Sequence, residues 1–138
     1  MGLILDSSIV ISAERSGQTA ADLLDRIVTK FGDQPAAISA VGLTELVHGV
    51  YRAYTPEILQ RREAFLRELT SLVAVYPYTA EVAWLAGRID AEQRTGGVVI
   101  PFADLLIGAT ALSLGFDVLT LNLRDFRRIP RLSVHLIE

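Results

Sequence analysis

A short apolar run near the start of the chain constrains the fold more than any other feature. Residues 2–5 read GLIL, without a polar side chain, and Asp6 follows directly. A strand with two apolar faces is typical of a parallel sheet that is covered by helices on both sides. The sequence therefore predicts that Gly2–Leu5 is a buried strand with a carboxylate at its carboxyl end.

Segments typical of helices and of strands alternate along the rest of the chain. Thr19–Phe31 carries apolar residues at helical spacing, and Thr19 with Asp22 is suited to cap its start. The other predicted helices are 42–53, 55–72, 79–96 and 102–114, and the other predicted strands are 36–39, 72–75, 117–121 and 132–137. This alternation predicts a three-layer α/β/α fold with a mainly parallel central sheet.

Composition excludes several classes of protein. The 138 residues are 51% hydrophobic and 21% charged, so we expect one packed domain over residues 1–138 rather than a disordered chain. The absence of cysteine excludes disulfides, thiol nucleophiles and cysteine-based zinc sites. The longest runs without a charged residue are 12 residues, against ~20 for a membrane span. We therefore expect no membrane segment and a cytoplasmic location.

Four acidic residues follow predicted strands or lie near the start of the helices after them. They are Asp6, Glu45, Asp104 and Asp125. In an open α/β sheet, ligands bind outside the carboxyl ends of the strands. Each acid alone also suits a helix N-terminus, and Asp125 also suits a surface ion pair with the arginines around it. Their joint occurrence at one predicted edge favours a shared site.

Such a cluster of carboxylates needs positive charge, because converging carboxylates raise one another's pKa. Oxygen ligands without cysteine favour Mg²⁺ or Mn²⁺ over zinc. Ions of this kind, held by carboxylates, commonly serve the hydrolysis of phosphodiesters. The four acids therefore indicate a metal-dependent phosphodiesterase.

Four segments, in order along nearly the whole chain, carry a family resemblance. They are LILDSS at 3–8, TELVHG at 44–49, IPFADLLIGATA at 100–111 and TLNLRDF at 120–126. On these segments, the last two above all, the chain resembles the PIN-domain ribonucleases, and specifically the VapC-type toxins of bacterial toxin–antitoxin pairs. The resemblance implies a PIN-like three-layer α/β/α sandwich.

The resemblance also implies an activity and partners. It implies a Mg²⁺-dependent endoribonuclease that hydrolyses RNA with a metal-activated water and inhibits translation until a VapB-like antitoxin neutralises it. A homodimer is expected as well. Asp6 and Asp104 match the metal-binding aspartates of the family, and Glu45 matches the acid that completes the cluster.

The fourth acidic position differs among family members. Many carry an acid where this chain has Asn122, and others rely on the acid three residues later, which is Asp125 here. We expect Asp125 to be the fourth catalytic acid, with Asn122 and Ser8 as orienting groups.

Basic residues near Asp125 are candidates for RNA binding. Arg124, Arg127 and Arg128 offer the planar guanidinium that suits phosphate, although a solvated surface is an equal alternative. The net charge of −3 does not exclude RNA, because without the four site acids 12 acidic residues remain against 13 basic ones. We expect His48 and His135 to be structural or surface residues.

Two alternative functions remain open. One is a PIN scaffold that has lost catalysis and binds only RNA or a protein. The other is a receiver-like signalling domain, which needs an acid pair after the first strand and a lysine near the last strands. Asp6 has no acidic neighbour, and the single lysine, Lys30, lies in a predicted helix.

Overall fold

The sheet of the computed structural model, which describes residues 1–137, has five strands that all run parallel. The strands are β1 (Leu3–Leu5), β2 (Ala36–Ser39), β3 (Ala74–Tyr76), β4 (Asp117–Thr120) and β5 (Val134–Leu136). Their order across the sheet is β3-β2-β1-β4-β5. The predicted parallel sheet is therefore confirmed, with β1 at its centre.

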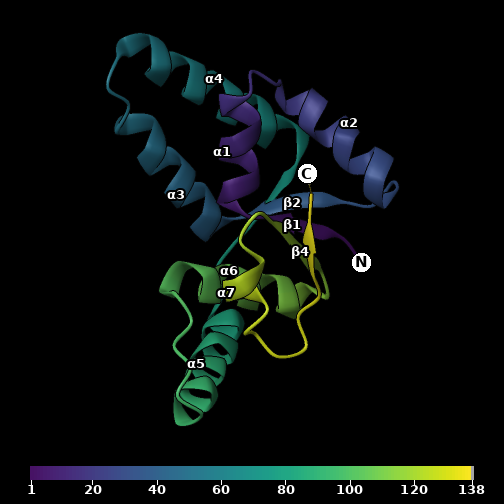
Figure 1. Ribbon diagram of the computed structural model, residues 1–138, viewed down its shortest axis with the longest axis vertical. Coiled ribbons are helices and arrows are strands. Elements are labelled where there is room, and N and C mark those ends of the chain that lie inside the picture. Colours follow the sequence, from purple (N-terminus) through teal and green to yellow (C-terminus); the bar gives the residue numbers. More distant parts are fainter. Residues whose placement is uncertain (138) are drawn as a thin grey trace.

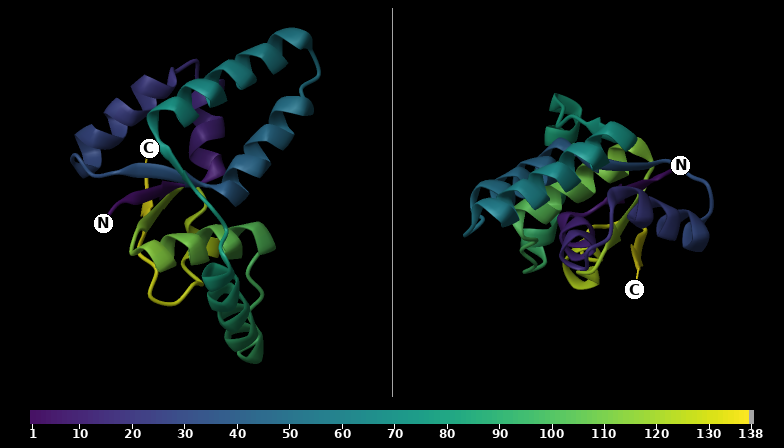
Figure 2. Two further views of the ribbon diagram at one scale, coloured as in Figure 1. Left: turned by 180° about the vertical axis from the view of Figure 1, so that it is seen from behind. Right: turned by 90° about the horizontal axis from the view of Figure 1, so that it is seen from above.

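Helices cover both faces of this sheet (Figures 1 and 2). On one face lie α1 (Ser7–Arg15), α2 (Ala20–Phe31), α3 (Ala40–Tyr51) and α4 (Pro56–Leu72), and on the other lie α5 (Ala80–Thr95), α6 (Phe102–Leu114) and α7 (Leu123–Phe126). The three-layer α/β/α prediction is confirmed. Across residues 1–137, none of the helices combines the length and the apolar character needed to span a membrane.

The central strand supplies both layers of the core. Leu3 and Leu5 pack in a cluster with α1, α2, α3 and α4, whereas Ile4 packs in a second cluster with α5, α6 and Phe126 of α7. Successive side chains of a strand point to opposite faces, so one apolar run serves both clusters. All three β1 side chains are fully buried.

The strand order changes direction at β1, and ligands commonly bind at the carboxyl end of such a strand. From β1 the chain proceeds to β2 on one side, and it returns later to β4 on the other side. At such a reversal the connections leave the sheet in opposite directions and open a space between them. Leu5 pairs with Leu119, so Asp6 and Thr120 lie side by side at this point.

Local structure differs from the sequence prediction in two helices and in several bounds, since α3 spans Ala40–Tyr51 rather than 42–53 and β5 spans Val134–Leu136 rather than 132–137. Helix α1 was not predicted, and neither was the short α7. Strand β3 begins at Ala74, because Leu72 still belongs to α4. The predicted cap of α2 is confirmed, since Thr19 and Asp22 each accept a hydrogen bond from the other's backbone N–H.

We expect Phe126→Ala to lower the free energy of unfolding by about 3–5 kcal/mol, because Phe126 is fully buried under the sheet and its loss leaves a cavity. Chemical denaturation followed by circular dichroism measures the change. Phe102→Ala is the matched control, because Phe102 is 74% exposed and its removal should cost about 0.5 kcal/mol or less. Equal losses in the two variants would contradict the packing described here.

Candidate active site

Asp6 is a buried carboxylate at the carboxyl end of β1, where it also begins α1. It is 4% exposed, and its Oδ2 accepts hydrogen bonds from the hydroxyls of Ser8 and Thr120, each at 2.8 Å. Within residues 1–137, no basic side chain forms an ion pair with it. Neutral hydroxyls thus hold this negative charge in place without cancelling it.

Thr120 joins the carboxyl ends of β1 and β4. The hydroxyl of this fully buried residue donates to Asp6 and accepts from the backbone N–H of Asn122 at 2.8 Å. Ser8 makes a second link, since its Oγ accepts from the N–H of Leu121 at 3.0 Å. Thr120 was not among the predicted site residues. The signal for it is the strand register, which sequence spacing alone does not reveal.

Glu45 reaches the same edge from α3. Its Oε1 accepts a hydrogen bond from the Ser7 hydroxyl at 3.2 Å. Burial raises the pKa of Glu45, the Ser7 hydrogen bond lowers it, and the nearby charge of Asp6 raises it again, with a net increase. Ser7 is a second residue at this end of the sheet that was not among the predicted site residues.

Asp104 lies in the first turn of α6, and its pKa depends on the charges of all the other acids of the site. Its pKa is raised from 3.8 to about 7, first by burial and then by the charges of Asp6, Asp125 and Glu45. Burial is the largest cause of this increase, and the smaller contributions of the other three acids reflect their positions near Asp104. The structure thus brings the four acids named from the sequence to one edge of the sheet.

Asn122 lies between two of these acids. Its amide Nδ2 donates to Asp125 Oδ2 at 2.9 Å and lies 3.5 Å from Asp104 Oδ2. Asp125, in α7, also faces Arg128, with 4.0 Å between Oδ1 and the guanidinium nitrogen. The Asn122 amide therefore bridges Asp104 and Asp125 at the carboxyl end of the sheet.

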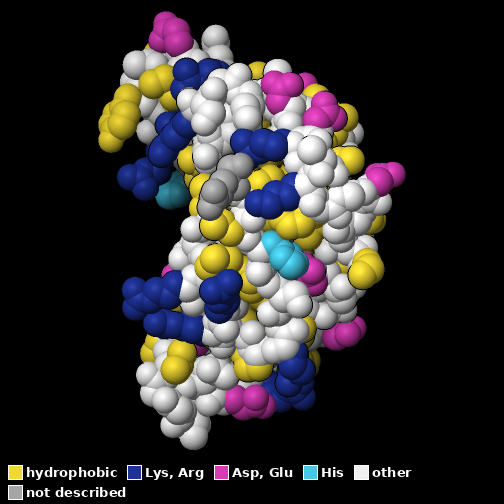
Figure 3. All heavy atoms as spheres, turned by 45° about the vertical axis from the view of Figure 1, so that its right-hand side comes forward, with side chains coloured by type: hydrophobic (Ala, Val, Ile, Leu, Met, Phe, Trp, Pro, Cys, Tyr) yellow, Lys and Arg dark blue, Asp and Glu magenta, His cyan; other side chains and the backbone are white. Residues whose placement is uncertain are grey.

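The candidate RNA-binding arginines line the same end of the molecule. Arg124 and Arg127 are exposed, and Arg128 also donates to the carbonyl of Val99 at 3.4 Å. Figure 3 shows Lys and Arg side chains on both sides of a hollow in the surface. Neither histidine takes part in the site, because His48 is exposed on α3 and His135 pairs with Asp117 at 2.8 Å.

The donor atoms suit a hard divalent cation. The edge offers carboxylate oxygens from four residues and no sulfur or imidazole, which fits Mg²⁺ or Mn²⁺. Within residues 1–137, no three acidic or histidine side chains converge closely enough to form a ready-made ligand set. Burial first, and then the charges of the other acids, raise the pKa of Asp104, and a bound cation would favour its ionised form.

We expect Asp104→Asn to stabilise the metal-free protein at about pH 8 by about 1–2 kcal/mol, and hardly at all near pH 4. The pKa of this carboxyl is 3.8 in the unfolded chain and about 7 in the folded one. Its ionisation therefore opposes folding increasingly between these two values, and fully above about pH 7. Thermal unfolding in EDTA at both pH values measures the difference. A gain in stability that is independent of pH would contradict the raised pKa of Asp104.

A family model described as PIN domain matches residues 3–132. This match covers nearly the whole chain and includes all four acids of the site. The chain therefore belongs to the PIN-domain family.

Within that family, the chain is similar to VapC ribonucleases. It is 36% identical to Ribonuclease VapC1 of Rickettsia felis over 97% of this chain and 95% of that protein. It is 34% identical to the tRNA(fMet)-specific endonuclease VapC of Salmonella typhimurium over 70% of this chain and 71% of that protein. The VapBC2 structure of Rickettsia felis, bound to a promoter DNA fragment, shares the fold with a TM-score of 0.85, 23% identity and full coverage of both chains.

Proposed function

We propose that this chain is a metal-dependent endoribonuclease and the toxin of a toxin–antitoxin pair, with Mg²⁺ or Mn²⁺ as its cofactor. The observation that supports this most strongly is the charge at the carboxyl end of the sheet. There the pKa of Asp104 is raised, first by burial and then by the charges of Asp6, Asp125 and Glu45. The VapC relatives, which are named as ribonucleases, support RNA as the substrate.

In this proposal the four acids have different roles. Asp6 and Asp104 hold the cation, and the hydroxyls of Ser8 and Thr120 fix the orientation of Asp6. Glu45 orients the attacking water, and Asn122 keeps Asp125 turned toward Asp104. When bound, the cation supplies Lewis acidity toward water and toward the phosphodiester. The reaction is hydrolysis that leaves a 5′-phosphate and a 3′-hydroxyl.

The antitoxin belongs to the same proposal. A groove of about 80 Å³ opens beside Glu45 between α1, α3 and α4, and most of its lining is apolar. A segment of a VapB-like partner that fills this groove would block access to the site. We further propose that the chain acts as a homodimer in the cytoplasm, where RNA cleavage inhibits translation.

Asp6→Asn and Asp104→Asn should each lower the rate of Mg²⁺-dependent RNA cleavage by about 100-fold or more, because each removes a charged ligand of the cation. The measurement is cleavage of a labelled RNA with Mg²⁺ or with EDTA. Asp33→Asn is the matched control, because this exposed acid lies just before the amino end of β2, at the opposite end of the strands from the site. Undiminished cleavage in EDTA, or full activity in either site variant, would contradict the proposal. Wild-type RNA binding without any cleavage would favour the inactive scaffold.

Replacing both Arg124 and Arg127 with Ala should reduce the salt dependence of RNA binding. Each phosphate contact contributes about 0.7 to the slope of log K against log salt for single strands, so the slope should fall by about 1.4. Fluorescence anisotropy with a short RNA, on the Asp104→Asn background, measures it. Arg88 and Arg94, already paired with acids on α5, provide the control double variant. An unchanged slope would assign Arg124 and Arg127 to an ordinary solvated surface.

A further inference from the structure

Two polar links join α1 to α3, one near the carboxylate edge and one farther along both helices. The first is the hydrogen bond from Ser7 to Glu45 at 3.2 Å. The second runs from Glu14, seven residues after Ser7, to Gly49, four residues after Glu45. Spacings of seven and four residues keep each pair on one side of its helix, so both links lie on the facing sides of α1 and α3.

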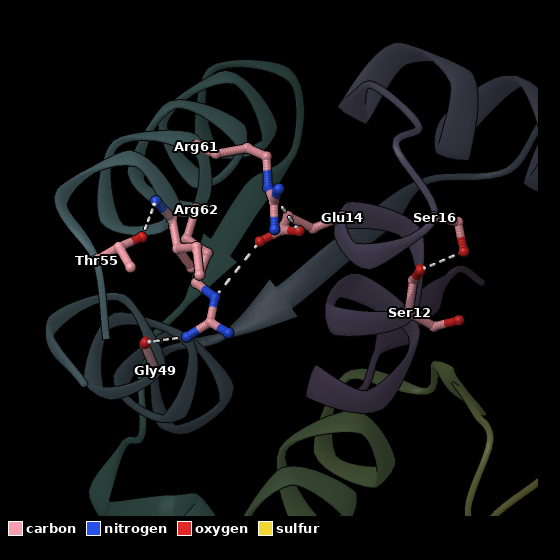
Figure 4. A network of polar contacts seen from close by, with 8 residues as sticks. Ser12, Glu14, Ser16, Gly49, Thr55, Arg61 and Arg62 are labelled. Atoms are coloured by element: carbon pink, nitrogen blue, oxygen red, sulfur yellow. Dashed lines mark hydrogen bonds and ion pairs between the residues drawn. The ribbon is translucent and has the colours of Figure 1, made fainter. Parts of the chain in front are cut away.

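Arg62 of α4 forms the second link. Its Nε lies 3.5 Å from Glu14 Oε1, and its terminal Nη1 donates to the carbonyl of Gly49 at 2.8 Å (Figure 4). Glu14 is 8% exposed, and the Arg62 side chain is 28% exposed. Removing one partner of an ion pair that is largely withdrawn from water leaves the other charge uncompensated, so this link resists separation of the helices.

The groove of about 80 Å³ opens between the two links, lined by side chains of both helices and of α4, and both Glu14 and Glu45 border it. Val10 of α1 and Leu46 and Val50 of α3 also border the groove, and these buried side chains belong to one core cluster. The two polar links therefore add restraints at the two ends of the groove to the apolar packing between the helices.

Such restraints oppose repulsion within the site. The Ser7 hydroxyl lies 3.5 Å from Asp6 Oδ1 and 3.2 Å from Glu45 Oε1, so the two carboxylates lie near each other and their negative charges repel. The Ser7 hydroxyl is the hydrogen-bond donor that opposes outward movement of Glu45 itself. A second restraint, one helical turn farther along α3, limits outward movement of the helix.

We propose that Arg62 is a positioning residue: by joining Glu14 of α1 to the Gly49 carbonyl of α3, it holds Glu45 at its working distance from Asp6. This inference rests on the proposed function. Arginine suits the task because its planar guanidinium serves two acceptors in different directions at once, whereas lysine presents a single nitrogen.

The chain offers a matched control in the neighbouring residue. Arg61 also pairs with Glu14, at 3.4 Å, but its side chain is 59% exposed, and within residues 1–137 it donates no hydrogen bond to α3. Removing Arg61 takes away an ion pair to the same carboxylate and leaves the bridge intact. Comparing the Arg61 and Arg62 variants thus distinguishes loss of the bridge to α3 from loss of a positive charge beside Glu14.

The experiment compares Arg62→Met, Arg62→Lys and Arg61→Met with the wild type. For each protein we would measure kcat and KM for RNA with saturating Mg²⁺, Mn²⁺ binding by calorimetry without RNA, and the melting temperature. Both Arg62 variants should lose about tenfold in kcat and several-fold in Mn²⁺ affinity, with KM within about twofold of wild type. Arg61→Met should match the wild type in kcat and Mn²⁺ affinity.

Two results would overturn the inference. One is equal loss of kcat in the Arg61 and Arg62 variants, and the other is a lower melting temperature in the Arg62 variants without any change in kcat or Mn²⁺ affinity. If Arg62→Met does not fold, Arg62→Lys carries the comparison, because it keeps the charge and loses the bridge. A wild type that binds Mn²⁺ but cleaves no RNA would refute the proposed function instead, and the Mn²⁺ affinities would still test the positioning role.

Discussion

The structure depends on keeping a negative charge buried at the end of its central strand. Asp6 is 4% exposed and accepts from the hydroxyls of Thr120 and Ser8, and within residues 1–137 no basic side chain pairs with it. Burying an ionised carboxylate is costly, and hydroxyl donors offset only part of that cost. The charge that remains is available to a cation, so the same arrangement that opposes stability prepares a binding site.

The rest of the fold holds the four acids near one another against the repulsion between their negative charges. Alternate side chains of β1 pack into the cores above and below the sheet, which fixes Asp6 relative to both layers. Phe126 anchors α7, and with it Asp125, beneath the sheet. On the other face, Ser7 and the bridge through Arg62 restrain the helix that carries Glu45. Each acid is thus held by an element whose own packing lies away from the site.

Patterns in the sequence were sufficient for the parallel sheet and for the placement of the four acids at one end of it, because both depend on short-range order. Helix α1 was missed because Ile9, Val10 and Ile11 are β-branched and resemble a continuation of β1, and its helical form depends on tertiary packing. Thr120 and the bridge through Arg62 depend on contacts between residues more than ten positions apart. No periodicity within one segment reports such contacts.

The chemistry of the RNA ends tests the central claim, that acids at this edge support metal-dependent hydrolysis, most directly. RNA cleaved by the purified protein with Mg²⁺ should carry 5′-phosphate and 3′-hydroxyl ends, detected by ligation of adaptors that require these groups. Water attack on phosphorus produces such ends. Fragments with 2′,3′-cyclic phosphate ends that also form in EDTA would indicate attack by the ribose 2′-hydroxyl and would contradict the account.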